Sequence, residues 1–189
     1  MRSALIVVDM QNAFINPVRG RPVERAHEVV EEVNALVRDA HRDGSPVFFT
    51  RDVGPTELPP GDPDGETDLF SGLDARGVVV DKGPGKDGAF SGFVLTSVSD
   101  TVGGGPGDGG LSGLAEQLRR AQVDHVVVVG LAADVCVAAT ARDARRLGYV
   151  VTLPLDATAF VHAHPSGDEA GLADLAAAGV TIERAPSTV

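Results

Sequence analysis

The feature of this sequence that most constrains its fold is a succession of short apolar runs rich in β-branched residues. Within each run the apolar residues follow one another, without the polar alternation of a half-exposed strand. Strands that are apolar on both faces must be covered on both sides, which is the usual situation in the parallel sheet of an α/β protein. Six such strands are predicted, at residues 4–8, 46–50, 77–80, 126–129, 149–153 and 180–182.

Segments with helical periodicity separate these strands. The longest, residues 23–42, places Val29, Val33 and Val37 on one face and is followed by Gly44, a residue type common just beyond a helix end. The alternation predicts a three-layer α/β/α fold with a Rossmann-like, parallel, six-stranded sheet, formed by residues 1–189 as a single domain. Further helices are predicted at residues 111–121, 134–147 and 166–178, and surface loops at residues 53–70 and 103–110.

The balance of charge limits the partners of this protein. Its 189 residues include 27 acidic and 16 basic ones, which gives a formal net charge of −11. This charge argues against binding to nucleic acid or to an anionic membrane, because phosphate groups are bound by clustered Lys and Arg. No apolar run approaches the roughly 18 residues of a membrane helix. We therefore expect a soluble, cytoplasmic protein whose partner is a small molecule.

Cys136 is the only cysteine of the chain. A single thiol can form neither an intramolecular disulfide nor a Cys-x-x-Cys metal clamp, so this residue is either a buried packing residue or a reactive group. Asp134 is a candidate N-cap for the predicted helix at 134–147, which would place the thiol in the first helical turn. The dipole and the free N–H groups of such a turn stabilise a thiolate, which favours the reactive interpretation.

Two charged residues follow other predicted strands. Asp9 comes directly after the strand at 4–8, and Lys82 lies just past the strand at 77–80. In an open α/β sheet, functional groups collect beyond the carboxyl ends of the strands, so Asp9, Lys82 and Cys136 are expected in one crevice. There the carboxylate can take the thiol proton, and the ammonium group can stabilise the charged groups. Taken singly, Asp9 is equally compatible with a helix cap and Lys82 with a solvated side chain.

The residues around these three positions resemble the isochorismatase-like cysteine hydrolases, a family that includes nicotinamidases and several amide and carbamoyl hydrolases. The likeness extends over nearly the whole chain and implies an enzyme that hydrolyses a C–N bond of a small-molecule amide or carbamoyl compound through a thioester. Three motifs in the family's order carry it: ALIVVDMQNAF at 4–14, DK followed by AFSGF within 81–93, and VGLAADVCV at 129–137.

The resemblance also implies roles for individual residues. Asp9, Lys82 and Cys136 correspond to a catalytic triad. The backbone N–H groups of Ala132 and Cys136 correspond to an oxyanion hole, and the peptide bond between Leu131 and Ala132 is expected to be cis. Family members usually form dimers or tetramers, so a homo-oligomer is expected. Positions that contact the substrate are matched by Phe14, Phe90 and Leu131.

The sequence departs from the nicotinamidases of this family around the pocket. Those enzymes bind a metal through an Asp-x-His pair and a further His, whereas here Asp52 begins the sequence DVGP and no histidine lies between positions 41 and 125. Asp52 with Glu57 or Asp62 falls short of the three or four protein donors that a zinc centre requires. We therefore expect no metal and no cofactor, and we do not expect nicotinamide as the substrate. Ala13 and Ala133 replace polar residues of many relatives, which predicts a less polar pocket.

Several alternatives stay open. Lys86 is a second candidate for the catalytic amine, although Lys82 follows its strand more directly. A nucleotide-binding module is disfavoured, because the glycine-rich residues 103–110 follow no strand directly and contain no phosphate-loop motif. Within the family, a vinyl ether hydrolase of the isochorismatase type and a catalytically inactive binding subunit are the alternatives to an amidase.

Overall fold

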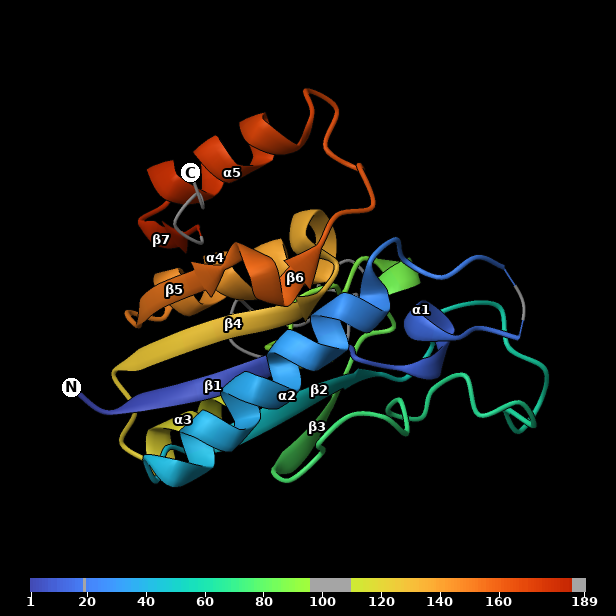
Figure 1. Ribbon diagram of the computed structural model, residues 1–189, viewed down its shortest axis with the longest axis horizontal. Coiled ribbons are helices and arrows are strands. Elements are labelled where there is room, and N and C mark those ends of the chain that lie inside the picture. The colour runs from blue at the N-terminus through green and yellow to red at the C-terminus, as the bar shows by residue number, and fades with distance from the viewer. Residues whose placement is uncertain (19, 96–109, 185–189) are drawn as a thin grey trace.

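The computed structural model describes residues 1–18, 20–95 and 110–184 of the chain. In this part a single parallel sheet has the strand order β3-β2-β1-β4-β5-β7, with β6 paired to the end of β4 (Figure 1). This confirms the predicted fold class. The loop predicted at residues 103–110 lies outside the described residues, except for Gly110. The strands are β1 (Ser3–Val8), β2 (Val47–Asp52), β3 (Val78–Lys82), β4 (His125–Leu131), β5 (Val150–Pro154), β6 (Thr158–Ala159) and β7 (Val180–Glu183).

The sheet has seven strands in the described part of the chain, one more than predicted. Each predicted strand corresponds to an observed one, with ends that differ by at most two residues. The additional strand, β6, pairs with Gly130 and Leu131, and the Thr158 hydroxyl donates a hydrogen bond to the carbonyl oxygen of Gly130 at 2.6 Å. A strand of two residues is too short to show a periodic pattern in the sequence, so β6 could not be predicted.

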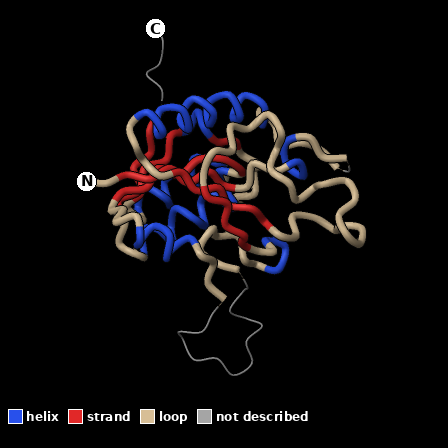
Figure 2. Tube along the Cα trace, turned by 90° about the horizontal axis from the view of Figure 1, so that it is seen from below, coloured by secondary structure: helices blue, strands red, loops and turns tan. Residues whose placement is uncertain are grey.

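Helices cover both faces of the sheet. On one face, α2 (Ala26–Arg42) buries Val29 and Val33 against residues of β1 and β2. On the other face, α3 (Leu114–Arg120) and α4 (Ala138–Arg146) bury Leu114 and Ala141, among others, against β1 and β4, and α5 (Asp168–Ala177) packs on α4 and β7. Figure 2 shows the strands between these two helical layers. Among the described residues no helix has the length and apolar character needed to cross a membrane.

Strands β1 and β4 are neighbours at the centre of the sheet, where the strand order reverses. Val8, the last residue of β1, pairs with Thr50 of β2 on one side and with Gly130 of β4 on the other. Gly130 has a φ of +106°, and a Cβ atom at this position would overlap the backbone of Val8. Only glycine therefore lets the two strands approach this closely. Because the strands are parallel, the segments after β1, β2, β3 and β4 leave the sheet at the same edge.

Candidate active site

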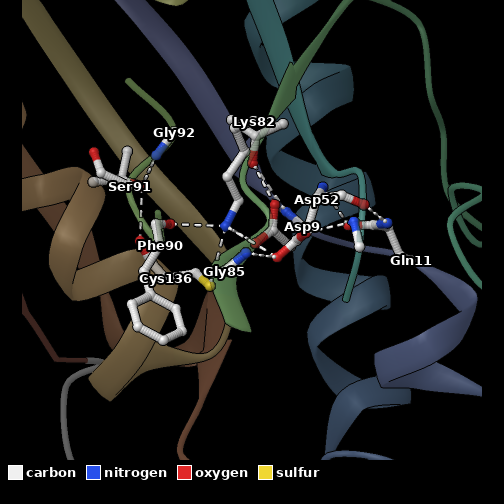
Figure 3. Close-up of polar contacts among 12 residues, drawn as sticks. Asp9, Gln11, Asp52, Lys82, Gly85, Phe90, Ser91, Gly92 and Cys136 are labelled. Carbon is white, nitrogen blue, oxygen red and sulfur yellow. Dashed lines mark hydrogen bonds and ion pairs between the residues drawn. The ribbon is translucent and has the colours of Figure 1, made fainter. Parts of the chain in front are cut away.

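Three side chains from distant parts of the sequence meet at the carboxyl edge of the sheet. Asp9 follows β1, Lys82 is the last residue of β3, and Cys136 lies in the π-helix η3 (Ala133–Val137) after β4. The Nζ atom of Lys82 lies 2.8 Å from Oδ2 of Asp9 and 3.3 Å from Sγ of Cys136. Figure 3 shows the ammonium group between the carboxylate and the sulfur. The structure thus brings together the three residues predicted as a triad.

The backbone at the end of β1 determines where the Asp9 carboxylate lies. A φ of +50° turns the chain out of the strand, and the Asp9 N–H donates to the carbonyl oxygen of Thr50 at 3.2 Å. The Thr50 hydroxyl donates to Oδ1 of Asp9 at 2.7 Å. The carboxyl group is completely buried, and this burial raises the pKa of Asp9 above its ordinary value despite the opposing charge of Lys82. A carboxylate with a raised pKa is a better proton acceptor.

Lys82 is the only buried cation of this cluster in the described structure. Its ammonium group also donates to the carbonyl oxygen of Phe90 at 2.8 Å and lies 3.7 Å from Oδ2 of Asp52. Burial by itself lowers the pKa of a lysine. Here the negative charge of Asp9, with which Lys82 also forms a hydrogen bond, and the charge of Asp52 outweigh that effect, and the pKa of Lys82 is raised. Lys82 therefore stays positively charged at neutral pH.

Cys136 is buried, with an exposed fraction of 7%, and its side chain lines a pocket. Burial, together with the negative charge of Asp9, raises the pKa of the Cys136 thiol, and the charge of Lys82 opposes this shift only in part. The raised pKa favours the protonated thiol, beside the carboxylate of Asp9. Desolvation of the sulfur thus opposes the stabilisation of a thiolate that a helix N-terminus would give.

The predicted helix at residues 134–147 also begins differently. Residues 133–137 form the π-helix η3, whose N-cap residue is Ala132, and α4 starts only at Ala138. Asp134 is not the N-cap. Its carboxylate instead accepts the N–H of Val161 at 3.0 Å and the N–H of Ala163 at 2.5 Å. Asp134 thus fixes the segment after β6 beside the pocket, a tertiary contact that the local sequence pattern does not reveal.

Asp52, the last residue of β2, is a further member of the buried cluster. Its two carboxylate oxygens accept the N–H groups of Gly54 and Gly85, both at 2.9 Å. The side chain of Gln11 accepts the Asp52 N–H at 2.8 Å and donates to the Asp52 carbonyl oxygen at 2.9 Å. Asp52 therefore holds the glycine-rich loop after β3 against the ends of β1 and β2. From the sequence, Asp52 was expected only as a weak metal ligand, although its place at a strand end is the same signal that identified Asp9 after β1.

The cluster adjoins a pocket of about 240 Å³ beside the sulfur. Its wall includes the three predicted substrate contacts Phe14, Phe90 and Leu131. A larger hollow of about 400 Å³ beside α5 contains none of the triad residues, so the pocket beside the sulfur is the candidate active site. The other lining residues are Val23, Asp52, Pro55, Gly85, Lys86, Ala132, Val135, Cys136 and Val161.

Lys86 occupies a different place from Lys82. It lies in the short helix η1 (Gly85–Asp87), and its side chain is 39% exposed. Its Nζ atom lies 3.3 Å from the carbonyl oxygen of Thr56 and 3.4 Å from Oε1 of Glu57. Lys86 is therefore a residue of the pocket rim, whereas Lys82 contacts both the carboxylate and the sulfur of the cluster.

The peptide bond between Leu131 and Ala132 is cis, as the resemblance implied. Ala132 directly precedes the π-helix that carries Cys136, and both residues line the pocket. The Thr140 hydroxyl donates to the carbonyl oxygen of Cys136 at 2.7 Å and accepts the N–H of Gly92 at 2.9 Å. These bonds join the loop that follows β3 to the helix that carries the sulfur.

The residues around Asp52 do not fit the zinc site of nicotinamidases. Both Asp52 oxygens accept backbone N–H groups, and the Asp62 carboxylate accepts three hydrogen bonds from residues 66 and 67. Glu57 is 95% exposed. Across residues 1–18, 20–95 and 110–184, no three His, Cys, Asp or Glu side chains are grouped in a way that could hold a metal ion. The donor set that zinc requires is not present in this part of the chain.

Curated proteins share sequence with this chain. Streptothricin hydrolase of Streptomyces noursei is 32% identical over 158 residues, which cover 82% of this chain and 49% of that protein. A nicotinamidase of Saccharomyces cerevisiae is 42% identical over 52 residues, which cover 28% of this chain and 24% of that protein. The matched segments therefore span half or less of the length of these relatives.

The fold and the family are shown by longer matches. The crystal structure of the pyrazinamidase of Pyrococcus horikoshii in complex with zinc superposes with a TM-score of 0.74 at 27% identity, covering 97% of this chain and 99% of that one. The isochorismatase domain family matches residues 3–186. Because this match includes all the strands of the sheet and the whole Asp9, Lys82 and Cys136 cluster, the chain belongs to the isochorismatase family.

Proposed function

We propose that this protein is a cysteine-dependent amidohydrolase that cleaves the C–N bond of a small-molecule amide through a thioester. The observation that carries this proposal is the buried contact among Asp9, Lys82 and Cys136 at the wall of a pocket. A thiol beside a carboxylate base and a fixed cation is the arrangement that nucleophilic catalysis needs. The family, with relatives named as a nicotinamidase, a pyrazinamidase and a streptothricin hydrolase, supports it.

The first step forms the thioester. Asp9 takes the proton of the Cys136 thiol as the sulfur attacks the amide carbonyl carbon, and a tetrahedral oxyanion results. When the C–N bond breaks, Asp9 returns this proton to the departing nitrogen, which leaves as ammonia or an amine. Lys82 keeps its charge throughout, so the negative charge that moves from carboxylate to sulfur to oxygen remains close to a buried cation.

We propose the backbone N–H groups of Ala132 and Cys136 as the donors that stabilise the oxyanion. Both residues line the pocket, one directly before the π-helix and one within it. One such donor typically contributes about 3 kcal/mol to transition-state stabilisation. Phe14, Phe90 and Leu131 form the wall against which the rest of the substrate packs.

The second step returns the enzyme to its starting state. Asp9 takes a proton from a water molecule, the hydroxide adds to the thioester carbonyl carbon, and the C–S bond breaks. The sulfur regains its proton from Asp9, and the carboxylic acid leaves. The sum of both steps is one amide and one water converted to one acid and one ammonia or amine, with no oxidant, reductant or metal consumed.

Ammonia release from a panel of small primary amides tests this function. We expect the wild-type protein to release ammonia from at least one of them, and the Cys136→Ala variant to release none above the blank. Intact-mass spectrometry after a rapid acid quench is expected to show an acyl group on wild-type protein and none on Cys136→Ala. Turnover by Cys136→Ala at the wild-type rate would contradict the cysteine mechanism.

The assembly and location of the protein are part of the proposal. From the family resemblance we propose a homo-oligomer, a dimer or a tetramer, that works in the cytoplasm, where a free thiol stays reduced. Light scattering coupled to size-exclusion chromatography measures the oligomer, and a mass equal to the monomer's 19.5 kDa would contradict it. Cell fractionation tests the location.

A further inference from the structure

The pocket beside Cys136 is small. Its volume is about 240 Å³, below the range of about 300–1,000 Å³ that is typical of pockets for drug-sized ligands. An apolar cavity of about 150 Å³ is large enough to hold benzene. The pocket therefore has room to enclose one six-membered ring that carries a carboxamide group.

The wall of this pocket is mainly apolar. Two of its side chains are partly open to solvent, Phe90 with an exposed fraction of 39% and Val161 with 43%. An apolar substituent that covers them removes this surface from water, which favours its binding. The large apolar side chains of the wall are Phe14, Val23, Pro55, Phe90, Leu131, Val135 and Val161.

The polar side chains of the pocket are already engaged. Among the described residues that line it, only Asp52, Lys86 and Cys136 carry a polar or charged side chain. The carboxylate oxygens of Asp52 accept two backbone N–H groups, and the Lys86 ammonium group lies at the rim beside Thr56 and Glu57. The Cys136 sulfur is the proposed nucleophile. Among the described residues that line the pocket, Lys86 at the rim is therefore the one charged side chain that is not held by backbone groups within the buried cluster.

We infer that the amidase proposed above takes an uncharged amide whose substituent is a single hydrocarbon ring or a branched chain of similar size. The inference rests on the proposed function and adds the class of substrate. A ring nitrogen, a hydroxyl group or a carboxylate on that substituent would be buried without a hydrogen-bond partner, which opposes binding. Apolar packing, rather than a zinc ion or a polar anchor, then holds the ring.

Three aromatic amides test this inference, of which the first two have nearly the same shape. Benzamide and nicotinamide differ only by one ring nitrogen, and 3-carbamoylbenzoate adds a carboxylate to the benzamide ring. We expect kcat/KM for benzamide to be at least about tenfold higher than kcat/KM for nicotinamide. We expect it to be about a hundredfold higher than kcat/KM for 3-carbamoylbenzoate. Ratios within about threefold of unity, or a preference for either polar amide, would overturn the inference while the released ammonia still supported the proposed function.

A variant of the wall gives a second measurement. Phe90→Ala removes the ring at the pocket mouth but keeps the backbone carbonyl that accepts the Lys82 hydrogen bond, so KM for benzamide is expected to rise about tenfold with little change in kcat. Leu147→Ala removes an exposed apolar side chain at the end of α4, away from the pocket, and is expected to change neither KM nor kcat. Unchanged KM in Phe90→Ala contradicts the inference. If that variant unfolds on heating below the wild-type transition, Phe90→Leu replaces it, with a smaller rise in KM expected.

Binding to the Cys136→Ala protein separates pocket selectivity from turnover. This variant keeps the wall and the buried Asp9 and Lys82 pair but cannot form a thioester. Titration calorimetry is expected to show benzamide bound at least about tenfold more tightly than nicotinamide. If the wild-type protein releases ammonia from no amide, the proposed function fails, and the same titration still decides which substituent the pocket prefers.

Discussion

The ammonium group of Lys82 lies 3.3 Å from the sulfur of Cys136, although 54 positions separate the two residues in the sequence. The same ammonium group lies 2.8 Å from Asp9, and the side chains of both charged residues are fully buried. A proton can therefore pass from the sulfur to the carboxylate without a change in the net charge of the site. Because these groups share one low-dielectric environment, a change to one of them alters the ionisation of the others.

Replacing Cys136 with Ala removes the proposed nucleophile. Hydrolysis is expected to fall at least about a thousandfold, because a covalent intermediate can no longer form. The free energy of unfolding is expected to fall by only about 1 kcal/mol, because the substitution removes a single sulfur atom from the pocket wall. Urea denaturation and ammonia release measure the two effects. A variant that retains more than a tenth of the activity would exclude Cys136 as the nucleophile.

Replacing Asp9 with Asn is expected to have opposite effects on turnover and on thiol reactivity. Loss of the base lowers hydrolysis by about 10²–10⁴-fold. The negative charge of Asp9 is one of the causes that raise the pKa of the Cys136 thiol, after burial itself, so its removal lowers that pKa. The thiolate fraction at pH 7 then rises, and alkylation by iodoacetamide is expected to become faster.

The wild-type protein is the reference for this measurement. Because the pKa of its thiol is raised above the ordinary value, iodoacetamide is expected to alkylate it more slowly than glutathione at pH 7. Asp81→Asn is the matched acid-to-amide control, since Asp81 lies beside Lys82 in β3 but pairs with Arg51 in solvent. If iodoacetamide alkylates the Asp9→Asn variant more slowly than the wild-type protein, the charge of Asp9 does not raise the pKa of the Cys136 thiol.

Lys82→Met and Lys86→Met distinguish the two candidate amines. Removing the Lys82 cation leaves the buried carboxylates of Asp9 and Asp52 without compensation, which typically costs about 3–5 kcal/mol of stability. The ion pair of Lys86 with Glu57 is exposed, and its loss is expected to change stability by less than about 1 kcal/mol. Chemical denaturation of both variants, with hydrolysis assayed beside it, checks this. If Lys86→Met lowers hydrolysis more than Lys82→Met does, Lys86 rather than Lys82 is the catalytic amine.

Gly130→Ala tests the close approach of β4 to β1. A Cβ atom there would overlap the backbone of Val8, and backbone cannot move aside cheaply, so a loss of more than about 4 kcal/mol is expected. Gly44→Ala is the control, because Gly44 also has a positive φ, +70°, but a Cβ atom there would meet nothing within 4 Å. Its cost is expected to be about 1–2 kcal/mol, from backbone conformation alone. Similar thermal transition temperatures for the two variants would contradict the close contact between Gly130 and Val8.

Removal of metal ions is expected to leave hydrolysis unchanged. The oxygens of Asp52 are engaged by backbone N–H groups, and no other group among residues 1–18, 20–95 and 110–184 has the donors for a metal. Activity is compared before and after dialysis against EDTA, with elemental analysis of the same samples. One bound zinc ion per chain, together with activity that is lost on dialysis and restored by zinc, would show that hydrolysis depends on a metal ion.

Several local features could be predicted because their cause is local. The strands were recognised to within two residues because burial on both faces makes each run continuously apolar. Phe14, Phe90 and Leu131 were placed at the pocket from motif positions alone, and all three line it. Strand β6 and the role of Asp134 could not be predicted in this way, because two paired residues and two long-range hydrogen bonds leave no periodic pattern in the sequence.

The sequence by itself determined the layered fold, the positions of the main strands and which three side chains meet at the edge of the sheet, because apolar patterns and short motifs record them directly. Only the tertiary structure decided that burial raises the pKa of the Cys136 thiol, that Asp52 holds the loop after β3 and that Lys86 stays at the rim. These properties depend on burial and on charges contributed by separate strands. Electrostatic energy varies with distance in space and with the surrounding dielectric, and neither can be read from the spacing of residues along a chain.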